Sequence, residues 1–403
     1  MLAFGAGMSG GETARDAARA AAAQAAAEVA APKLGIVFVS ASYPDADGVS
    51  AAVAEVIPGV PIVGGTSAAC VLGPKGSAAH GVSVVLVGGT GVEVASRTVA
   101  ISSPTLVEAV PVAEELAERA DEAARRGYVH YACLVFAPSL SVDGEALVAA
   151  VRKGAGARAQ LVGGLTGDEL TMDRPRVLAD GALRSDRITL TGLFTKRPLG
   201  IAARHGWHAV GPKRTVTRAD GVHLLELDGR PALEVWLEDV RANGGEPPAD
   251  RRELAVYLTN GYVFGIHDEP RGAAPVSSSD DPMVVRAPLH IEDDGTIRLS
   301  GAIGEGTHVR LVVSSREDLL KASAEAASAA VLRADAHVAG ALVLSCSSRI
   351  AALGECFTDE PAEIGRRVRA PIGGACVYGE IARNVRDVDA FFNTTTVVLA
   401  FSA

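Results

Sequence analysis

A segment with two adjacent glycines occurs three times in this chain. The three copies are Pro61–Ser67, Leu161–Glu169 and Pro371–Ile381. An apolar run precedes each copy, and from its leucine to the first glycine the separations are 30, 29 and 31 residues. Internal repetition constrains a fold more strongly than other sequence signals.

Another apolar run follows each copy, at Val82–Val87, Ile188–Phe194 and Thr395–Phe401. We therefore expect one unit of helix, strand, helix, strand and strand, used three times in an α/β (mixed α+β) protein. Adjacent glycines favour a tight turn at a strand end, and the polar residues after it would lie on a loop suited to binding.

The sequence changes character near Lys196. Alternating patterns and Asp-Gly turns predict an antiparallel middle region, with strands at Thr215–Arg218, Ala255–Leu258 and Ile297–Leu299. Two polar stretches, Arg241–Arg252 and His267–Pro282, are predicted to be connecting loops, with a lid as the alternative.

Composition excludes several classes of protein. The 403 residues allow two or three domains, and no apolar run approaches the roughly 20 residues that cross a bilayer. A net charge of −10 argues against nucleic-acid binding, which needs a basic face. The five cysteines contain no C-x-x-C pair, so reduced thiols are expected. With no recognisable signal peptide, we expect a cytoplasmic protein with no membrane partner.

The most specific motif is the segment His205–Thr217, followed by Leu225–Leu233, which resembles the junction of the FIST domain family. Further segments are similar to the family's glycine turns and to its Cys-x-x-Arg, Gly-Glu and Asn-x-Thr signatures, namely Gly64–Ser67, Val162–Asp168, Ser345–Arg349, Gly379–Glu380 and Phe392–Thr395. The first unit departs from the family, with Ala69-Cys70 where Gly-Glu is common. The resemblance covers nearly the whole chain and implies two related parts, a FIST N-terminal-type domain at 1–197 and a FIST C-terminal-type domain at 198–403.

The resemblance also implies a function. The family is regarded as a sensory module for small ligands, amino acids among them, that acts with a separate signalling protein such as a kinase or a chemotaxis-type receptor. One branch of the family is linked to haem and nitric oxide, so a haem-based gas sensor is an alternative, although we expect no cofactor.

Arg349 and Glu380 are the leading candidates for binding residues. A guanidinium can clamp a carboxylate at two points, and a carboxylate can receive an ammonium group, so together they would suit an α-amino acid. The alternative is a structural ion pair of Arg349 with Glu355 or Glu380.

Five further residues complete the predicted ligand site on the loops of the second and third units: Asp168, Gly373, Gly374, Tyr378 and Asn393. Tyr378 offers a ring and a hydroxyl, and the glycines offer backbone N–H groups. Each has an ordinary alternative, since loop acids are often solvated, Asn often caps turns, and tyrosine often packs in a core.

Cys346 is a further candidate for ligand contact, and with Cys376 it raises the alternative of a thiol-dependent enzyme. Both cysteines are expected on loops of the third unit, near each other, although a small buried hydrophobic role is commoner. His205, His208 and His223 are clustered in the sequence and could supply an axial haem ligand, although partly buried strand histidines are far commoner.

Overall fold

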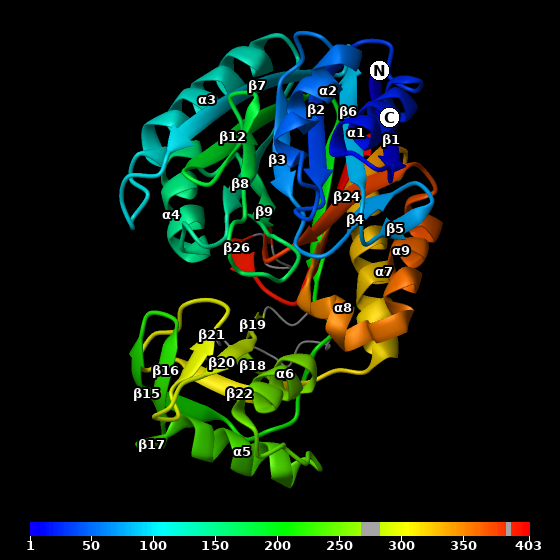
Figure 1. Ribbon diagram of the computed structural model, residues 1–403. Helices are drawn as coiled ribbons and strands as arrows, with labels where there is room; N and C mark the ends of the chain where they lie inside the picture. Colours follow the sequence, from blue (N-terminus) through cyan, green and yellow to red (C-terminus); the bar gives the residue numbers. More distant parts are fainter. Residues whose placement is uncertain (267–282, 384–387) are drawn as a thin grey trace.

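The computed structural model describes residues 1–266, 283–383 and 388–403. These residues form a large body of three sheets covered by helices and a smaller body from residues 205–314, which lies beneath it in Figure 1. The predicted loop His267–Pro282 lies outside the described residues. The domain boundary predicted at 197/198 falls between the strands that end at Thr195 and begin at Leu199.

The three sheets of the large body share one strand order. The first contains β1 (Leu2–Ser9), β6 (Val82–Gly89), β2 (Pro32–Val39) and β3 (Ile62–Thr66). The second contains β7 (Val92–Ala100), β12 (Arg187–Thr195), β8 (His130–Pro138) and β9 (Gln160–Thr166). The third contains β13 (Leu199–Arg204), β27 (Thr396–Ser402), β23 (Val338–Cys346) and β24 (Ile372–Val377). The predicted α/β class with repeated units is confirmed.

Each sheet is completed by a hairpin from a different unit. The hairpin β10–β11 (Val177–Ala179, Ala182–Arg184) of the second unit pairs with β3 of the first. The hairpin β25–β26 (Gly379–Arg383, Asp389–Phe392) of the third pairs with β9 of the second. The hairpin β4–β5 (Val71–Gly73, Gly76–Ala78) of the first pairs with β24 of the third. The three exchanges close a ring.

The core of the large body lies between the three sheets. Phe38 and Phe136 meet edge to face there, with ring centroids 5.4 Å apart, and Phe4 lies 5.4 Å from Phe401. Helices cover the outer faces in pairs (Figure 1): α1 (Ala14–Ala26) and α2 (Val49–Val56), α3 (Ala109–Arg125) and α4 (Gly144–Ala155), and α7 (Arg316–Arg333) and α9 (Asp359–Val368), with the short α8 (Ser348–Leu353) after β23. The strands between two apolar layers therefore consist of nearly continuous apolar residues.

The diglycine pairs lie inside β3, β9 and β24, so the predicted turns are wrong. A Cβ on Gly64, Gly163 or Gly374 would meet the carbonyl oxygen of a valine on the neighbouring parallel strand, at 1.9 Å in the case of Gly374. These glycines allow close strand approach rather than a change of direction. Gly64, Gly163 and Gly374 occupy the same position in the three units. Six residues after each of them lie Cys70, Glu169 and Glu380, respectively.

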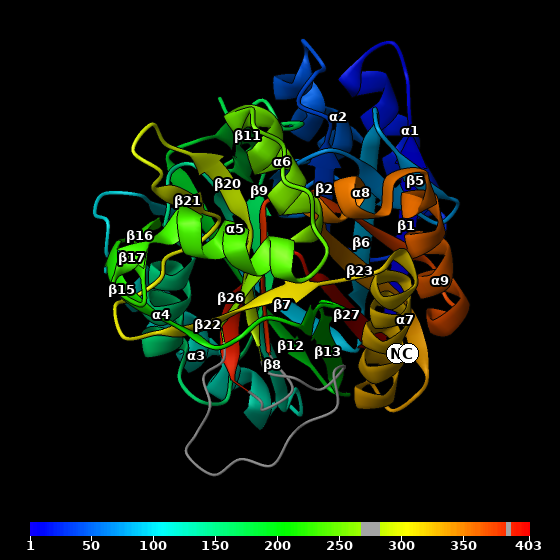
Figure 2. The same ribbon diagram turned by 90° about the horizontal axis from the view of Figure 1, so that it is seen from below.

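The smaller body is an antiparallel sheet inserted between β13 and α7, which confirms the predicted middle region. Its strands are β14 (His208–Ala209), β15 (Arg214–Asp220), β16 (His223–Leu227), β17 (Arg230–Pro231), β18 (Val263–Ile266), β19 (Val284–Arg286), β20 (Pro288–Ile291), β21 (Ile297–Leu299) and β22 (His308–Val313). It carries α5 (Ala232–Ala242) and α6 (Arg251–Gly261), and Figure 2 shows both helices from below.

The strand predicted at Ala255–Leu258 is wrong, because these residues lie in α6. The Asp250 side chain accepts hydrogen bonds from the N–H groups of Arg252 and Glu253 and so caps this helix. A local cap has outweighed the strand propensity of the apolar residues that follow. Among the described residues, no helix combines the length and apolar character needed to span a membrane.

Candidate functional site

Arg349 lies at the start of α8, is 1% exposed, and uses all of its N–H donors within the protein. Its Nε donates to Glu360 at 2.8 Å, and its terminal nitrogens donate to four other acceptors: the carbonyl oxygens of His205, Leu319 and Thr394 and the hydroxyl of Ser323. A guanidinium has five donors. In this arrangement Arg349 has none left for a ligand carboxylate.

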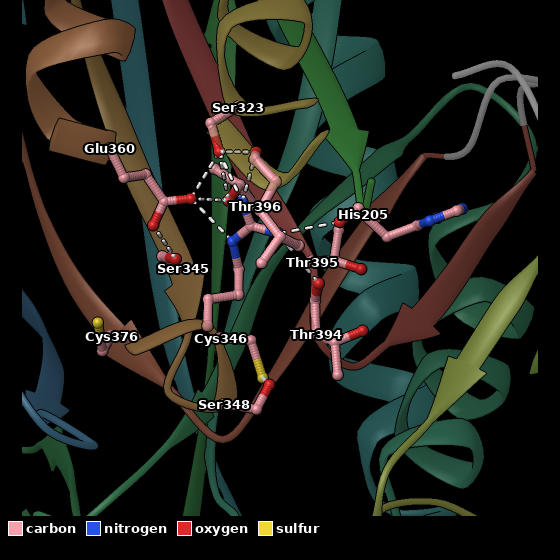
Figure 3. A network of polar contacts seen from close by, with 12 residues as sticks. His205, Ser323, Ser345, Cys346, Ser348, Glu360, Cys376, Thr394, Thr395 and Thr396 are labelled. Carbon is pink, nitrogen blue, oxygen red and sulfur yellow. Dashed lines mark hydrogen bonds and ion pairs between the residues drawn. The ribbon is translucent and has the colours of Figure 1, made fainter. Parts of the chain in front are cut away.

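Glu360 is the centre of the same network (Figure 3). It is 1% exposed and also accepts hydrogen bonds from Ser323 and Thr396 at 2.6 Å and from Ser345 at 2.9 Å. Burial alone would raise the pKa of Glu360, but the Arg349 charge and the hydroxyl groups outweigh it and hold that pKa below its usual value. The structure thus favours an ion pair for Arg349, and the partner is Glu360 rather than Glu355 or Glu380.

Glu380 is the second residue of β25, in the exchanged hairpin of the third unit, and is fully buried. One carboxyl oxygen accepts a hydrogen bond from the Thr395 N–H at 3.3 Å, and the other has no oxygen or nitrogen partner among the described residues. Burial raises the pKa of Glu380 well above its ordinary value. Thr394 and Thr395 link this carboxyl to Arg349, so the two leading candidates are neighbours without being paired.

Cys346 lies beside Glu380 at the end of β23. It is 3% exposed, and the Ser348 hydroxyl donates to its Sγ at 3.3 Å. Burial, assisted by the nearby Glu380 charge, raises the pKa of Cys346 to about 12. A nucleophilic thiol needs the opposite shift.

Asp168 and Tyr378 lie together, although they come from different units. The Tyr378 hydroxyl donates to Asp168 Oδ1 at 2.6 Å, and the carboxylate also accepts the N–H groups of Met172, Asp173 and Arg174. Burial opposes ionisation of Asp168, but these donors outweigh it and lower its pKa. Asp168 is 3% exposed, so the solvated-loop alternative does not describe it.

Asn393 joins the large body to the smaller one. Its side-chain nitrogen donates to the Tyr378 carbonyl at 3.4 Å, and its oxygen accepts from Arg286 of β19 at 3.2 Å. Arg286 is 1% exposed and also pairs with Glu145 of α4. Sequence reasoning missed Arg286, although a lone arginine within the apolar stretch Met283–Ala287 was a usable signal. It also missed Glu360, which carries no motif.

Gly373 and Gly374 serve packing. The Gly374 N–H donates to the Ser83 hydroxyl at 3.3 Å, and a Cβ on Gly373 would lie 2.6 Å from the Val85 side chain. In this arrangement the Gly374 N–H is engaged within the protein.

The second predicted thiol, Cys376, lies in β24 rather than on a loop. Its Sγ is 3.2 Å from the Sγ of Cys70, which was not among the candidates. Burial, and then its contact with Cys70, raises the pKa of Cys376 well above the usual value. Neither predicted thiol therefore has the electropositive surroundings that activate a nucleophile.

The histidines proposed for haem are separated or engaged. His205 Nδ1 accepts the Trp207 N–H at 2.9 Å, His208 lies 3.4 Å from Asp318, and His223 lies on β16 of the smaller body. Within residues 1–266, 283–383 and 388–403, no group of three or more His, Cys, Asp or Glu side chains is arranged to hold a metal ion.

Three buried polar atoms without a hydrogen-bond partner among the described residues belong to Thr394 or to side chains that bond Asn393 and Thr395. They are the free oxygen of Glu380, the hydroxyl of Thr394 and the Nε of Arg286. Leaving such atoms unpaired costs about 1–3 kcal/mol each, more for charged groups. A carboxyl, a hydroxyl and a guanidinium N–H are the kinds of group that bond the donors and acceptors of a small polar molecule, and the Arg286 Nε also packs against Gly301.

Comparisons with known proteins give a family but no specific activity. Residues 33–230 match the model of the FIST N domain, and residues 232–383 match that of the FIST C domain. None of the curated proteins matches. Among solved structures, "cyanuic acid hydrolase from A. caulinodans" is 12% identical with full coverage of both chains and a TM-score of 0.35. A glutamine-dependent NAD+ synthetase from Acinetobacter baumannii is 14% identical over 70% of this chain and 65% of that one, with a TM-score of 0.10.

Proposed function

Because this chain belongs to the FIST family, whose domains are proposed sensory or signalling domains, we propose that it binds a small polar metabolite, such as an amino acid, and reports its presence to a separate signalling protein. The supporting observation is the group of unpaired buried polar atoms at Glu380, Thr394 and Arg286. Natural proteins rarely leave such atoms unpaired, and the capacity to bond a small polar molecule gives these atoms a role.

The chemistry of these groups suits an α-amino acid. The Glu380 carboxyl receives the ammonium group, while the Arg286 Nε and the Thr394 hydroxyl receive the carboxylate. Cys346 lies beside Glu380 and offers a soft, apolar wall. Asn393 accepts a hydrogen bond from Arg286 and donates one to the Tyr378 carbonyl, and the Tyr378 hydroxyl in turn donates to Asp168. In this proposal Arg349, Gly373 and Gly374 position the site.

The site lies where the two bodies meet, which suits a sensor. Arg286 belongs to the smaller body, whereas Glu380 and Thr394 belong to the larger one. The bond from Arg349 to the His205 carbonyl holds the first residue of the smaller body against the larger one. The Ser314 hydroxyl donates to the Gly206 carbonyl and so joins the two ends of the smaller body. A ligand that contacts both bodies would favour one relative placement, which a kinase or chemotaxis-type receptor in trans can read. We place this protein in the cytoplasm, with no nucleic-acid or membrane partner.

A thermal-shift panel tests the proposal. Protein shown by native mass spectrometry to carry no small molecule is heated with each amino acid and with small carboxylic acids. We expect a subset to raise the unfolding midpoint, because a ligand that binds only the native state stabilises it. Glu380→Gln should abolish the rise. Glu169→Gln, at the corresponding position of the second unit, should keep it, because Glu169 bonds Ser42 instead. The proposal fails if no compound stabilises ligand-free protein, or if the two variants respond alike.

A further inference from the structure

Two buried cysteines meet where the first unit contacts the third. Cys70 precedes β4, Cys376 lies in β24, and their Sγ atoms are 3.2 Å apart although 306 residues separate them in sequence. The two backbones are fixed against each other, because the Cys376 N–H donates to the Cys70 carbonyl at 2.9 Å and the Ala68 N–H donates to the Cys376 carbonyl at 2.8 Å.

We propose that Cys70 and Cys376 are an oxidation site. A hydroperoxide oxidises the two thiols to a disulfide between them, which joins the first unit covalently to the third. A disulfide requires the sulfurs to approach by roughly 1 Å more. Both side chains already point into the same contact, so a modest side-chain adjustment can supply this. This inference is independent of the proposed ligand.

Corresponding positions at the other two hairpin junctions differ. By position in the repeat, Cys70 corresponds to Glu169 and Glu380, and Cys376 corresponds to Thr66 and Leu165. At the junction of the third unit with the second, the strand pairing sets Glu380 opposite Gly164. A thiol pair at these positions therefore occurs at one junction of the ring.

The oxidant reaches the pair when the β4–β5 hairpin opens. This hairpin is at the edge of the third sheet, its register with β24 covers Val71 and Leu72, and its tip at Pro74 and Lys75 is exposed. Short edge elements open locally at a lower cost than the core. Opening exposes Cys70, which is 5% exposed when the hairpin is closed.

The reaction balances with one equivalent of peroxide. The Cys70 thiolate attacks one peroxide oxygen, the O–O bond breaks, and Cys70 becomes a sulfenic acid while hydroxide leaves and takes up the proton that the thiol lost. The Cys376 sulfur then attacks the sulfenic sulfur, the S–O bond breaks, and water leaves with the Cys376 proton. The two thiols lose two electrons, and the peroxide gains them.

Hydrogen peroxide added to the native full-length protein tests this assignment. After free thiols are alkylated, a non-reducing digest should contain one cross-linked peptide pair bearing Cys70 and Cys376, and dithiothreitol should release it. The same oxidation should slow amide hydrogen exchange across residues 71–78, because the disulfide holds the β4–β5 hairpin against β24. Cys70→Ser and Cys376→Ser should each abolish both effects, while Cys133→Ser, at a buried cysteine of the second unit, should keep them.

Three results would overturn the assignment: a cross-link between other cysteines, sulfinic acid at Cys70 without a cross-link, or all five thiols still free after treatment. If the Cys376→Ser protein does not fold, the Cys70→Ser variant alone tests the disulfide. Cys70 lies at the edge of the sheet, so its replacement should disturb folding less. Loss of the cross-link in Cys133→Ser would equally count against the pair.

Discussion

The Tyr378 hydroxyl donates a 2.6 Å hydrogen bond to Asp168, and this bond joins the third unit to the second. The two residues are 210 positions apart: Asp168 follows β9, and Tyr378 lies between β24 and β25. Sequence analysis named both as ligand contacts, and the structure makes them contacts of each other.

Tyr378→Phe removes this bond while the backbone N–H groups still hold Asp168. We expect a loss of about 1.5–3 kcal/mol in the free energy of unfolding, the range for hydrogen bonds to charged groups. Urea denaturation measures the change. Tyr128→Phe, which deletes an exposed hydroxyl bond to the Thr90 carbonyl, is the control and should cost less.

Acid should weaken the same junction. The pKa of Asp168 is lowered in the folded protein, so its contribution to stability is present above its unfolded pKa of about 4 and is lost as pH falls through the folded pKa. The decline in stability below pH 4 should be shallower in Tyr378→Phe, since one of the donors that lower the pKa is gone. Equal slopes in the two proteins would contradict this account.

Breaking the Arg349–Glu360 pair should be severe. Glu360→Gln leaves a buried guanidinium without its countercharge, and the expected cost is about 3–5 kcal/mol. Arg349→Met should cost a similar amount, and the double variant less than the sum of the two, because neither charge is then left alone. Arg366→Gln breaks the exposed pair with Glu363 and should cost far less, because solvent screens that pair. Additive losses in the double variant would show that the two residues act separately.

Glu380→Gln should stabilise the ligand-free protein at higher pH. The folded pKa of Glu380 is raised, so its contribution is fully present below the unfolded pKa of about 4.3 and is lost as pH rises through the folded pKa. An amide does not ionise, so the variant escapes this loss. Melting curves at pH 5 and pH 8 should show the advantage of Glu380→Gln growing with pH, and a shrinking advantage would refute the buried neutral carboxyl.

Gly374→Ala should prevent normal folding, because its Cβ would lie 1.9 Å from the Val343 carbonyl oxygen. Gly365→Ala is the matched control: Gly365 lies in α9, and a methyl group added there would meet no atom within 4 Å, so alanine should stabilise by roughly 0.5–1 kcal/mol. Soluble yield and circular dichroism distinguish the two outcomes. A well-folded Gly374→Ala protein would contradict the packing role of the strand glycines.

The repeated architecture could be predicted because each unit contains its own apolar strands. Val82–Val87 and Ile188–Phe194 are buried on both faces, and such strands consist of continuous apolar runs. The first strands of the first and second units, β1 and β7, were not predicted because they lack a continuous apolar run. Leu2–Ser9 contains two glycines, and in Val92–Ala100 charged and polar residues interrupt the apolar ones.

Site partners were harder to predict than site residues. Glu380, Tyr378 and Asn393 do lie in one neighbourhood, because β25 pairs with β26 so that Glu380 lies opposite Phe392, and Asn393 bonds the Tyr378 carbonyl. The acid that pairs with Arg349 comes from α9, and the arginine that contacts Asn393 comes from the smaller body. Such long-range pairings depend on how sheets and helices dock, and no spacing within one sequence records that.

The exchange of hairpins also sets an order for the growing polypeptide. The β4–β5 hairpin is made within the first 80 residues, yet the strand edge that receives it, Ile372–Val377, leaves the ribosome nearly 300 residues later. Until then the β4–β5 hairpin of the nascent chain has no strand edge to pair with. The edge of β3 likewise stays unpaired until residues 177–184 are made. Unpaired edges of this kind invite association with other chains. Translation to the last unit is thus the step that removes the final open edge of the first.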